Sequence, residues 1–106
     1  MINKVILIGK LQEDAATKAT TNDKQMTKLV VRTSESYKKD GETKWQNEYH
    51  NCKLFGDWVV STGLIDRLKK DIDVYVEGKL STYSYEDKNG QTRYVTEIIV
   101  ETLRIV

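Results

Sequence analysis

One strand-length segment, residues 45–55, alternates between two kinds of side chain. Successive residues of a strand point to opposite faces, so the two sets lie on opposite sides of a sheet. Flat rings beside a cation can stack on a planar ligand and hold an anionic group, as on a wet binding face. The set with rings and polar groups is Tyr49, Asn51, Lys53 and Phe55. The alternate set, which suits a hydrophobic core, is His50, Cys52 and Leu54.

Histidine and cysteine often act in catalysis or bind metals, but the sequence offers His50 and Cys52 of this segment no partners for either role. They are the only histidine and the only cysteine, and no cluster of ligand residues accompanies His50 at metal-binding spacing. A free cysteine among apolar neighbours in mid-strand behaves as a small hydrophobe. We therefore expect His50 in the core or an interface, and we expect no metal, no cofactor and no enzymatic activity.

Length and composition limit the class of protein. The 106 residues predict one domain spanning 1–106, and 39% hydrophobic with 31% charged residues fits an ordinary folded chain. A lone cysteine fits a reducing, cytoplasmic compartment, and no apolar run suggests a membrane span. The net charge is only +1. An anionic partner would therefore require the positive charge to be concentrated on one face.

Hydrophobic alternation and turn signals predict five strands, at residues 3–11, 24–36, 45–55, 73–86 and 92–106. Hairpin tips are expected at Asp40-Gly41, within a turn spanning residues 37–44, and at Asn89-Gly90. Residues 12–23 are interpreted as a loop. A helix is expected from Gly56 to about Lys70, capped by Asp57, with a buried stripe of Val60, Leu64, Ile65 and Leu68. This order predicts an all-β fold, the five-stranded OB-fold barrel with one helix between strands 3 and 4.

The first strand is apolar on both of its faces. Only one face of a strand in a small barrel meets the core, so the other face suggests a covering element or a partner subunit. The two sets are Val5, Leu7 and Leu11 on one face, and Ile6 and Ile8 on the other.

Six segments, in this order and spacing, resemble motifs of the bacterial type of single-stranded DNA-binding protein, the SSB family. They are Asn3–Leu11, Thr33–Tyr37, Glu48–His50, Leu54–Gly56, Val74–Leu80 and Asp87–Tyr94. Each motif alone is weakly specific, but together they extend from Asn3 to about Val100. The resemblance implies an OB-fold that binds and protects single-stranded DNA in replication, recombination or repair.

The resemblance also implies a site and an assembly. Aromatic residues of these motifs stack on bases in the family, which implies stacking by Tyr37, Tyr49, Phe55 and Tyr85. We expect phosphate contacts from Lys10, Arg32, Lys53, Lys79, Lys88 and Arg93. A homotetramer, or else a dimer, is implied, and its expected interface is Asn3, Val5, Ile6, Leu7, Ile8 and His50. A nucleoid-associated, cytoplasmic location follows from the same resemblance.

The sequence departs from the family pattern at several points. Three positions that often hold tryptophan hold tyrosine, while Trp45 and Trp58 match no stacking position and are expected to pack or to lie in an interface. Tyr94 is expected in the core. The family's Gly/Gln-rich tail with an acidic tip does not follow Val106, so the sequence is interpreted as truncated or as a short plasmid, phage or specialised form, and recruitment of repair enzymes by such a tail is not inferred. The alternative is an OB-fold interaction module resembling small primosomal proteins, which bind partners and DNA together.

Overall fold

The computed structural model describes residues 1–20, 22 and 24–106. Its strands are β1 (Val5–Leu11), β2 (Ala16–Ala19), β3 (Gln25–Lys39), β4 (Glu42–Phe55), β5 (Asp73–Glu86) and β6 (Thr92–Ile105). Two short helical segments, α1 (Trp58–Ser61) and η1 (Leu64–Arg67), connect β4 to β5. None of the helices in the described part of the chain has the length and apolar character required to cross a membrane.

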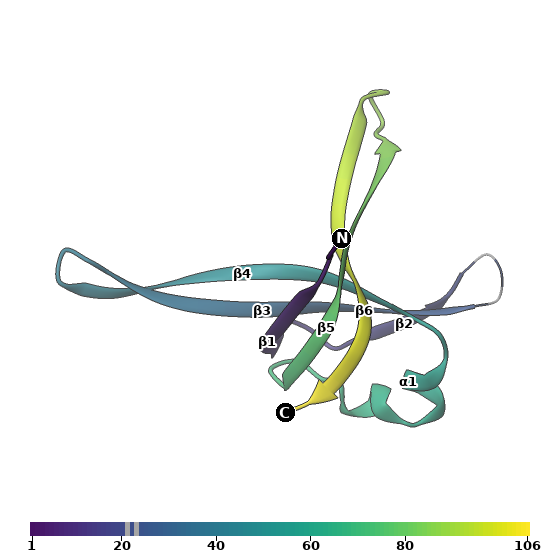
Figure 1. Cartoon of the computed structure of the whole chain (residues 1–106), viewed down its shortest axis with the longest axis horizontal. Coiled ribbons are helices and arrows are strands. Elements are labelled where there is room, and N and C mark those ends of the chain that lie inside the picture. The colour runs from purple at the N-terminus through teal and green to yellow at the C-terminus, as the bar shows by residue number, and fades with distance from the viewer. Residues whose placement is uncertain (21, 23) are drawn as a thin grey trace.

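Five of the strands close into a barrel, which confirms the predicted OB-fold. The strand order is β1-β5-β6-β4-β3-β2, and pairing of β1 with β3 at Lys10↔Arg32 and Leu11↔Val31 completes the circle. Among the residues that the structure describes, the short strand β2 pairs only with β3, outside that circle. The helical segments therefore lie between the third and fourth strands of the barrel (Figure 1).

Two glycines allow the backbones of neighbouring barrel strands to approach closely. A Cβ at Gly9 would collide with the carbonyl oxygen of Arg32 on β3, and one at Gly78 would collide with the carbonyl oxygen of Ile99 on β6. Gly78 also follows a register shift between β5 and β6. Bulges and glycines of this kind bend strands sharply enough to form a small barrel.

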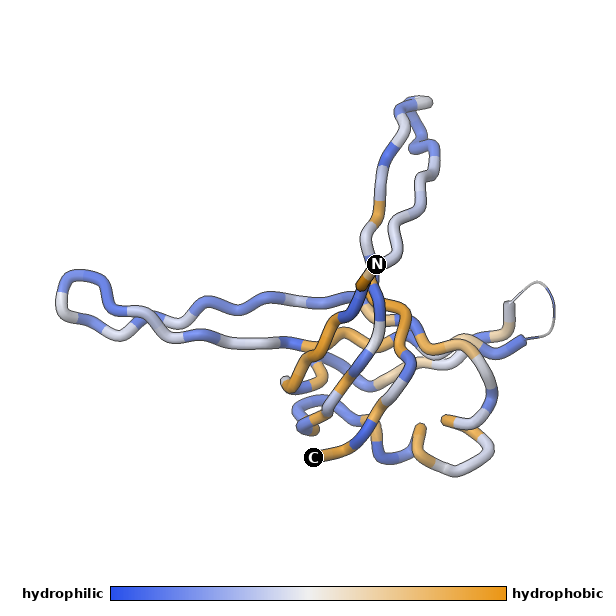
Figure 2. Tube along the Cα trace, in the orientation of Figure 1, coloured by the Kyte–Doolittle hydropathy of each residue, from blue (hydrophilic) through white to orange (hydrophobic). Residues whose placement is uncertain are grey.

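The core lies inside the barrel and is formed by inward-facing side chains of all five strands and of the β4–β5 connection. Figure 2 shows that the most hydrophobic stretches of the chain lie in the barrel, whereas the two arms are mostly hydrophilic. The fully or nearly buried members are Leu11, Leu29, Val31, Cys52, Leu54, Val59, Leu68, Val74, Val76, Ile98, Val100 and Leu103. Cys52 and Leu54 therefore occupy the core face of β4, as their alternation predicts.

Two hairpins extend beyond the barrel as arms (Figure 1). The β3–β4 hairpin keeps one unbroken register from Met26↔Phe55 to Lys39↔Glu42. The expected turn over residues 37–44 is therefore too long, because only Asp40 and Gly41 are unpaired. Both have positive φ, 54° and 80°, as a tight two-residue hairpin turn requires.

Two other expectations about local structure are wrong. The expected loop over residues 12–23 contains β2, which pairs with β3 and shares a hydroxyl–hydroxyl hydrogen bond between Thr17 and Thr27 of 2.9 Å. The expected helix shrinks to α1 and η1, because Gly63 adopts a left-handed φ of 76° between them. Asp57 makes no side-chain capping bond. The buried position in α1 is Val59, while Val60 is exposed.

Candidate functional site

The outer face of β4 presents aromatic rings to solvent. Tyr49 and Phe55 are each 54% exposed, while Cys52 and Leu54 point inward. The alternation of this strand thus positions two rings where a planar ligand could lie against them.

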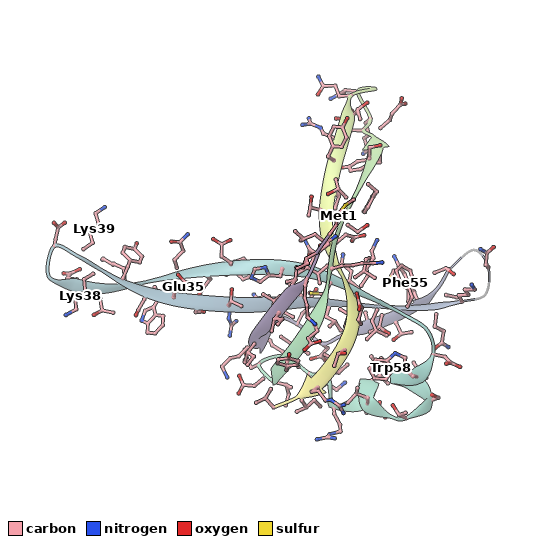
Figure 3. The ribbon with its side chains drawn as sticks, viewed as in Figure 1. Met1, Glu35, Lys38, Lys39, Phe55 and Trp58 are labelled. Atoms are coloured by element: carbon pink, nitrogen blue, oxygen red, sulfur yellow. The ribbon has the colours of Figure 1, made fainter. Side chains whose placement is uncertain are left out.

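The register of the β3–β4 hairpin separates its charges between two faces. Cross-strand partners share a face, so the pairing assigns each side chain to one side. The face of Tyr49 and Phe55 carries no carboxylate from these two strands, and its cations are Lys28, Arg32, Lys38 and Lys53. The opposite face carries the glutamates Glu35, Glu42 and Glu48. Figure 3 shows Lys38 and Lys39, neighbours at the tip, on opposite sides of the hairpin.

Lys53 connects three strands on the outer surface of the barrel. Its Nζ lies 2.8 Å from Glu97 Oε1 on β6 and 5.0 Å from the centre of the Tyr83 ring on β5. The hydrogen bond with Glu97 raises the pKa of Lys53. Glu97 therefore fixes the position of the Lys53 ammonium group and largely neutralises its charge.

Three more of the expected phosphate-binding residues form ion pairs within the chain. Lys10 contacts Asp73 at 2.9 Å, Arg32 contacts Asp71 at 3.2 Å, and Arg93 contacts Asp87 at 2.9 Å. Within the described part of the chain, Lys79 and Lys88 form no such pair. Phosphates would therefore compete with carboxylates at four of the six positions.

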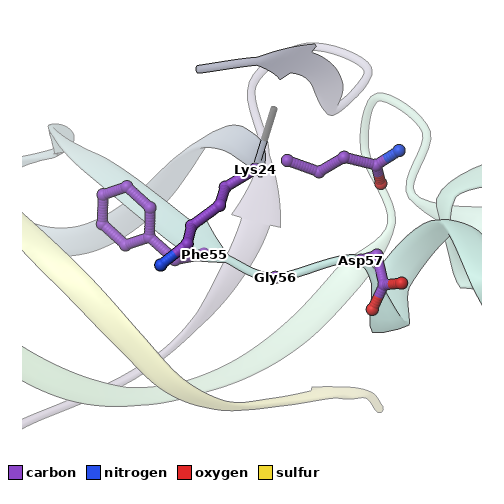
Figure 4. Close-up of a pocket in the computed structure, with 5 residues that line it drawn as sticks. Lys24, Phe55, Gly56 and Asp57 are labelled. Atoms are coloured by element: carbon purple, nitrogen blue, oxygen red, sulfur yellow. The ribbon is translucent and has the colours of Figure 1, made fainter. Parts of the chain in front are cut away.

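Phe55 forms one wall of a surface pocket of about 360 Å³ with four other residues, which are Lys24, Gln25, Gly56 and Asp57. Figure 4 shows the Lys24 side chain extending beside the Phe55 ring. Lys24 is exposed, so an ammonium group accompanies a ring that is open to stacking. Sequence reasoning missed Lys24, because only the pairing of Met26 with Phe55 brings the start of β3 beside the end of β4.

The four expected stacking residues do not all share one face. Tyr85 is exposed on the β5–β6 arm, where alternation puts it on the side of Lys79 and of Tyr83. Tyr37 is exposed as well, but it pairs with Lys44 on the glutamate-bearing face of the β3–β4 arm. The structure thus groups Tyr49 with Phe55, and places Tyr37 on the other side of the hairpin.

The expected interface residues fall into three pairs. Ile6 and Ile8 are exposed, whereas Val5 and Leu7 pack against the barrel core. The other two make hydrogen bonds within the chain. Asn3 exchanges two bonds, of 2.9 and 3.0 Å, with the backbone of Leu80, and His50 Nε2 lies 2.8 Å from Thr33 Oγ1.

One expectation about the other aromatic residues is wrong. Tyr94 is 75% exposed rather than buried, because the arm carries it beyond the barrel. Trp45 is 67% exposed and does not pack in the barrel; it lies on the Tyr49 face of β4. Trp58 is partly exposed at the start of α1, where Figure 3 shows it away from the arms.

The described residues contain no group of three or more His, Cys, Asp or Glu side chains that could hold a metal ion. Burial raises the pKa of the Cys52 thiol to about 12, so this group stays protonated near neutral pH. The site built by the structure is therefore a surface of rings and cations.

Comparison with known proteins agrees with this architecture. The structure is similar to that of the Plasmodium falciparum SSB in complex with ssDNA, with a TM-score of 0.84 and 26% identity over 100% of this chain and 96% of that one. It shares its fold with a deletion mutant of the single-stranded DNA binding protein from Thermus aquaticus, with a TM-score of 0.80 and 22% identity over 99% of this chain and 50% of that one. The model of the single-strand binding protein family matches residues 2–106. A match over almost the entire length, on a closed OB-fold barrel, shows that this chain belongs to the single-strand binding protein family.

Proposed function

We propose that this protein binds single-stranded DNA without sequence preference and shields it during replication, recombination or repair, with no catalytic step. Bases stack on exposed rings, and basic side chains follow the phosphates. Membership of the family supports this proposal, as does the similar Plasmodium falciparum protein, which was solved with ssDNA.

One observation carries the proposal: Tyr49 and Phe55 are exposed on a hairpin face to which β3 and β4 contribute lysines and an arginine but no carboxylate. Stacking tolerates any sequence because every base has a π-face, and each stack contributes about 1–3 kcal/mol. Segregated positive charge attracts a polyanion even though the whole chain carries only +1.

Tyr37 and Tyr85 belong to the proposed site as outlying positions. Both are exposed, and each lies on an arm rather than on the barrel. A strand that passes over Tyr49 and Phe55 would reach Tyr37 only by crossing an edge of the β3–β4 hairpin. Among the expected phosphate contacts we assign Lys79 and Lys88 as direct ones, and Lys10, Arg32, Lys53 and Arg93 as contacts that must first exchange a carboxylate partner.

A homotetramer, with a dimer as its building unit, is proposed for the assembly. Within the described residues, Val5–Gly9 pair with β5 along one edge and with no strand along the other. An unpaired edge beside the exposed Ile6 and Ile8 is suited to pairing with a second copy of the same strand. Sedimentation at micromolar concentration tests this, because a 12.3 kDa species alone would contradict it.

The binding proposal is tested by titrating the protein with oligo-dT at two salt concentrations. Tyr49→Ala and Phe55→Ala should each weaken binding by about 1 kcal/mol or more, and the affinity should fall with added salt because bound phosphates release counterions. Tyr94→Ala is the matched control, because Tyr94 is exposed and pairs with Ser84 on the face of the β5–β6 arm opposite to Tyr85. All variants should retain the wild-type melting temperature.

Two outcomes would contradict the proposal. Wild-type affinities for both Tyr49→Ala and Phe55→Ala would show that the assigned face is wrong. Equal affinity for single and double strands, or binding only when a partner protein is present, would favour the primosomal type of interaction module.

A further inference from the structure

We propose that Trp45 is an additional base-stacking residue, which extends the DNA track from the barrel onto the β3–β4 arm. This inference rests on the proposed function, since it adds a contact to the same DNA-binding face. It concerns a residue outside the motifs that carry the family resemblance.

Alternation places Trp45 on the face of Tyr49 and Phe55. The register of the hairpin is unbroken from Met26↔Phe55 to Lys39↔Glu42, so residues 45, 49 and 55 of β4 point to the same side. At about 3.3 Å per residue, Trp45 lies about 13 Å beyond Tyr49 along the strand, and Tyr49 lies about 20 Å from Phe55. The three rings therefore form a row that runs outward along one strand.

The indole ring of Trp45 is uncovered. It is 67% exposed, and its cross-strand partner Ser36 is too small to shield it. The flanking side chains on that face are also small or polar, and they are Ser34, Asn47 and Thr43. Tryptophan has the largest stacking surface of any side chain, so an exposed indole on a two-stranded arm is suited to contact a flat partner.

Charge favours a nucleic acid strand as that partner. Lys38 lies on the Trp45 face near the tip, and Arg32 lies on it near the barrel. The glutamates of the arm all point to the other side, where they would repel phosphates. Lys28 and Lys38 form no ion pair with residues that the structure describes, so these two ammonium groups are available to phosphates.

The direct test uses tryptophan fluorescence. The chain has two tryptophans, so Trp58→Phe leaves Trp45 as the only one. Oligo-dT of about 16 nucleotides, the upper end of OB-fold site sizes, should quench the emission of Trp45 in that variant. Emission that is unchanged when the oligonucleotide is bound would overturn the inference.

Affinity measurements supply a second test. Trp45→Ala should weaken binding of the long oligonucleotide about fivefold or more, the equivalent of about 1 kcal/mol. It should change binding of an oligonucleotide of about 4 nucleotides much less, because that length cannot reach from Phe55 to the arm. Trp45→Tyr should retain most of the affinity and Trp45→Leu should not. Gln46→Ala, on the opposite face of the arm, is the matched control.

The outcomes separate this inference from the function on which it rests. Loss of affinity in Tyr49→Ala, with wild-type affinity in Trp45→Ala, would contradict the role of Trp45 alone. Failure of the wild-type protein to bind oligo-dT would contradict the proposed function itself. A change in sedimentation of Trp45→Ala in the absence of DNA would assign the ring to a subunit interface and overturn the stacking role.

Discussion

The ammonium of Lys53 lies 2.8 Å from the carboxylate of Glu97, which is only 8% exposed. A charge buried to this extent needs its partner, because an unpaired buried ion is strongly unfavourable. Lys53 thus contributes to the fold as well as to the proposed DNA-binding surface, and substitutions of Lys53 and of Glu97 should affect different properties.

Glu97→Gln should strengthen DNA binding. The amide keeps the shape of the side chain and removes the negative charge, so Lys53 becomes available to a phosphate. One added phosphate contact should steepen the dependence of log affinity on log salt by about 0.7. Glu101→Gln, an exposed position on the same strand, controls for the change in net charge. Identical salt slopes in the two variants would contradict a screening role for Glu97.

Lys53→Met should destabilise the barrel by about 1–3 kcal/mol, because it leaves the buried carboxylate of Glu97 without its hydrogen-bonded cation. Chemical denaturation followed by circular dichroism measures the change. The double variant with Lys53→Met and Glu97→Met should recover most of the loss, since replacing both partners by apolar groups is often nearly neutral. No recovery in the double variant would show that the loss of stability does not come from the unpaired carboxylate of Glu97.

The carboxyl group of Asp87 should titrate below the ordinary range. Arg93 donates to it across 2.9 Å, and the backbone amides of Gln91 and Asn89 also donate to it, so its pKa is lowered, first by Arg93. A lowered folded-state pKa means that this carboxylate stabilises the β5–β6 tip above about pH 3.9 and that its contribution is lost as the pH falls further. NMR titration should show Arg93→Gln raising the pKa, whereas Lys88→Gln should leave it nearly unchanged.

The thiol of Cys52 should be inert in the folded protein. Burial raises its pKa to about 12, so at about pH 8 the native thiol holds almost no reactive thiolate, whereas an exposed cysteine with a pKa of about 8.5 would hold much more. A raised folded-state pKa also means that this group favours the native state below about pH 8.5, and that its contribution is lost as the pH rises toward 12. Reaction with a disulfide reagent should be slow natively and fast in denaturant; rapid native labelling would contradict the buried position.

Gly9→Ala should weaken barrel closure. The new methyl group would collide with the carbonyl oxygen of Arg32 and lie 3.0 Å from the Val31 side chain. Forced overpacking of this kind costs about 1–3 kcal/mol. Ser36→Ala, on the exposed arm, provides a control that should change the melting temperature little. A wild-type melting temperature for Gly9→Ala would show that β1 and β3 can separate at that point.

Sequence alternation predicted which face each residue occupies, because it follows directly from strand geometry. It separated Tyr49 and Phe55 from Cys52 and Leu54 correctly. It could not predict where a strand leaves the barrel. Tyr94 and Ile98 have the same parity on β6, yet Ile98 is 4% exposed and Tyr94 is 75% exposed, because the inner face of the strand has no opposite wall in the arm.

The electrostatics of the site could not be predicted either. Lys53 and Glu97 lie far apart in the sequence, and only the parallel pairing of β4 with β6 brings them together. Lys24 reaches Phe55 for a similar reason. The expected helix was misjudged because Gly63 interrupts it with a left-handed backbone, which helical spacing of apolar residues does not reveal.

The length of the β3–β4 arm can change without any change in the barrel. The outer residues of the arm, 34–39 and 42–49, are all exposed, so this part of the hairpin is maintained by backbone pairing and by surface polar contacts such as the 2.6 Å hydrogen bond from Ser34 to Asn47, without a buried core. Inserting residue pairs at the Asp40-Gly41 tip would lengthen the reach by about 3.3 Å per pair without altering the packed interior. The length of a DNA strand that the arm could contact and the stability of the barrel are thereby separable properties. Selection can change the first while leaving the second unchanged.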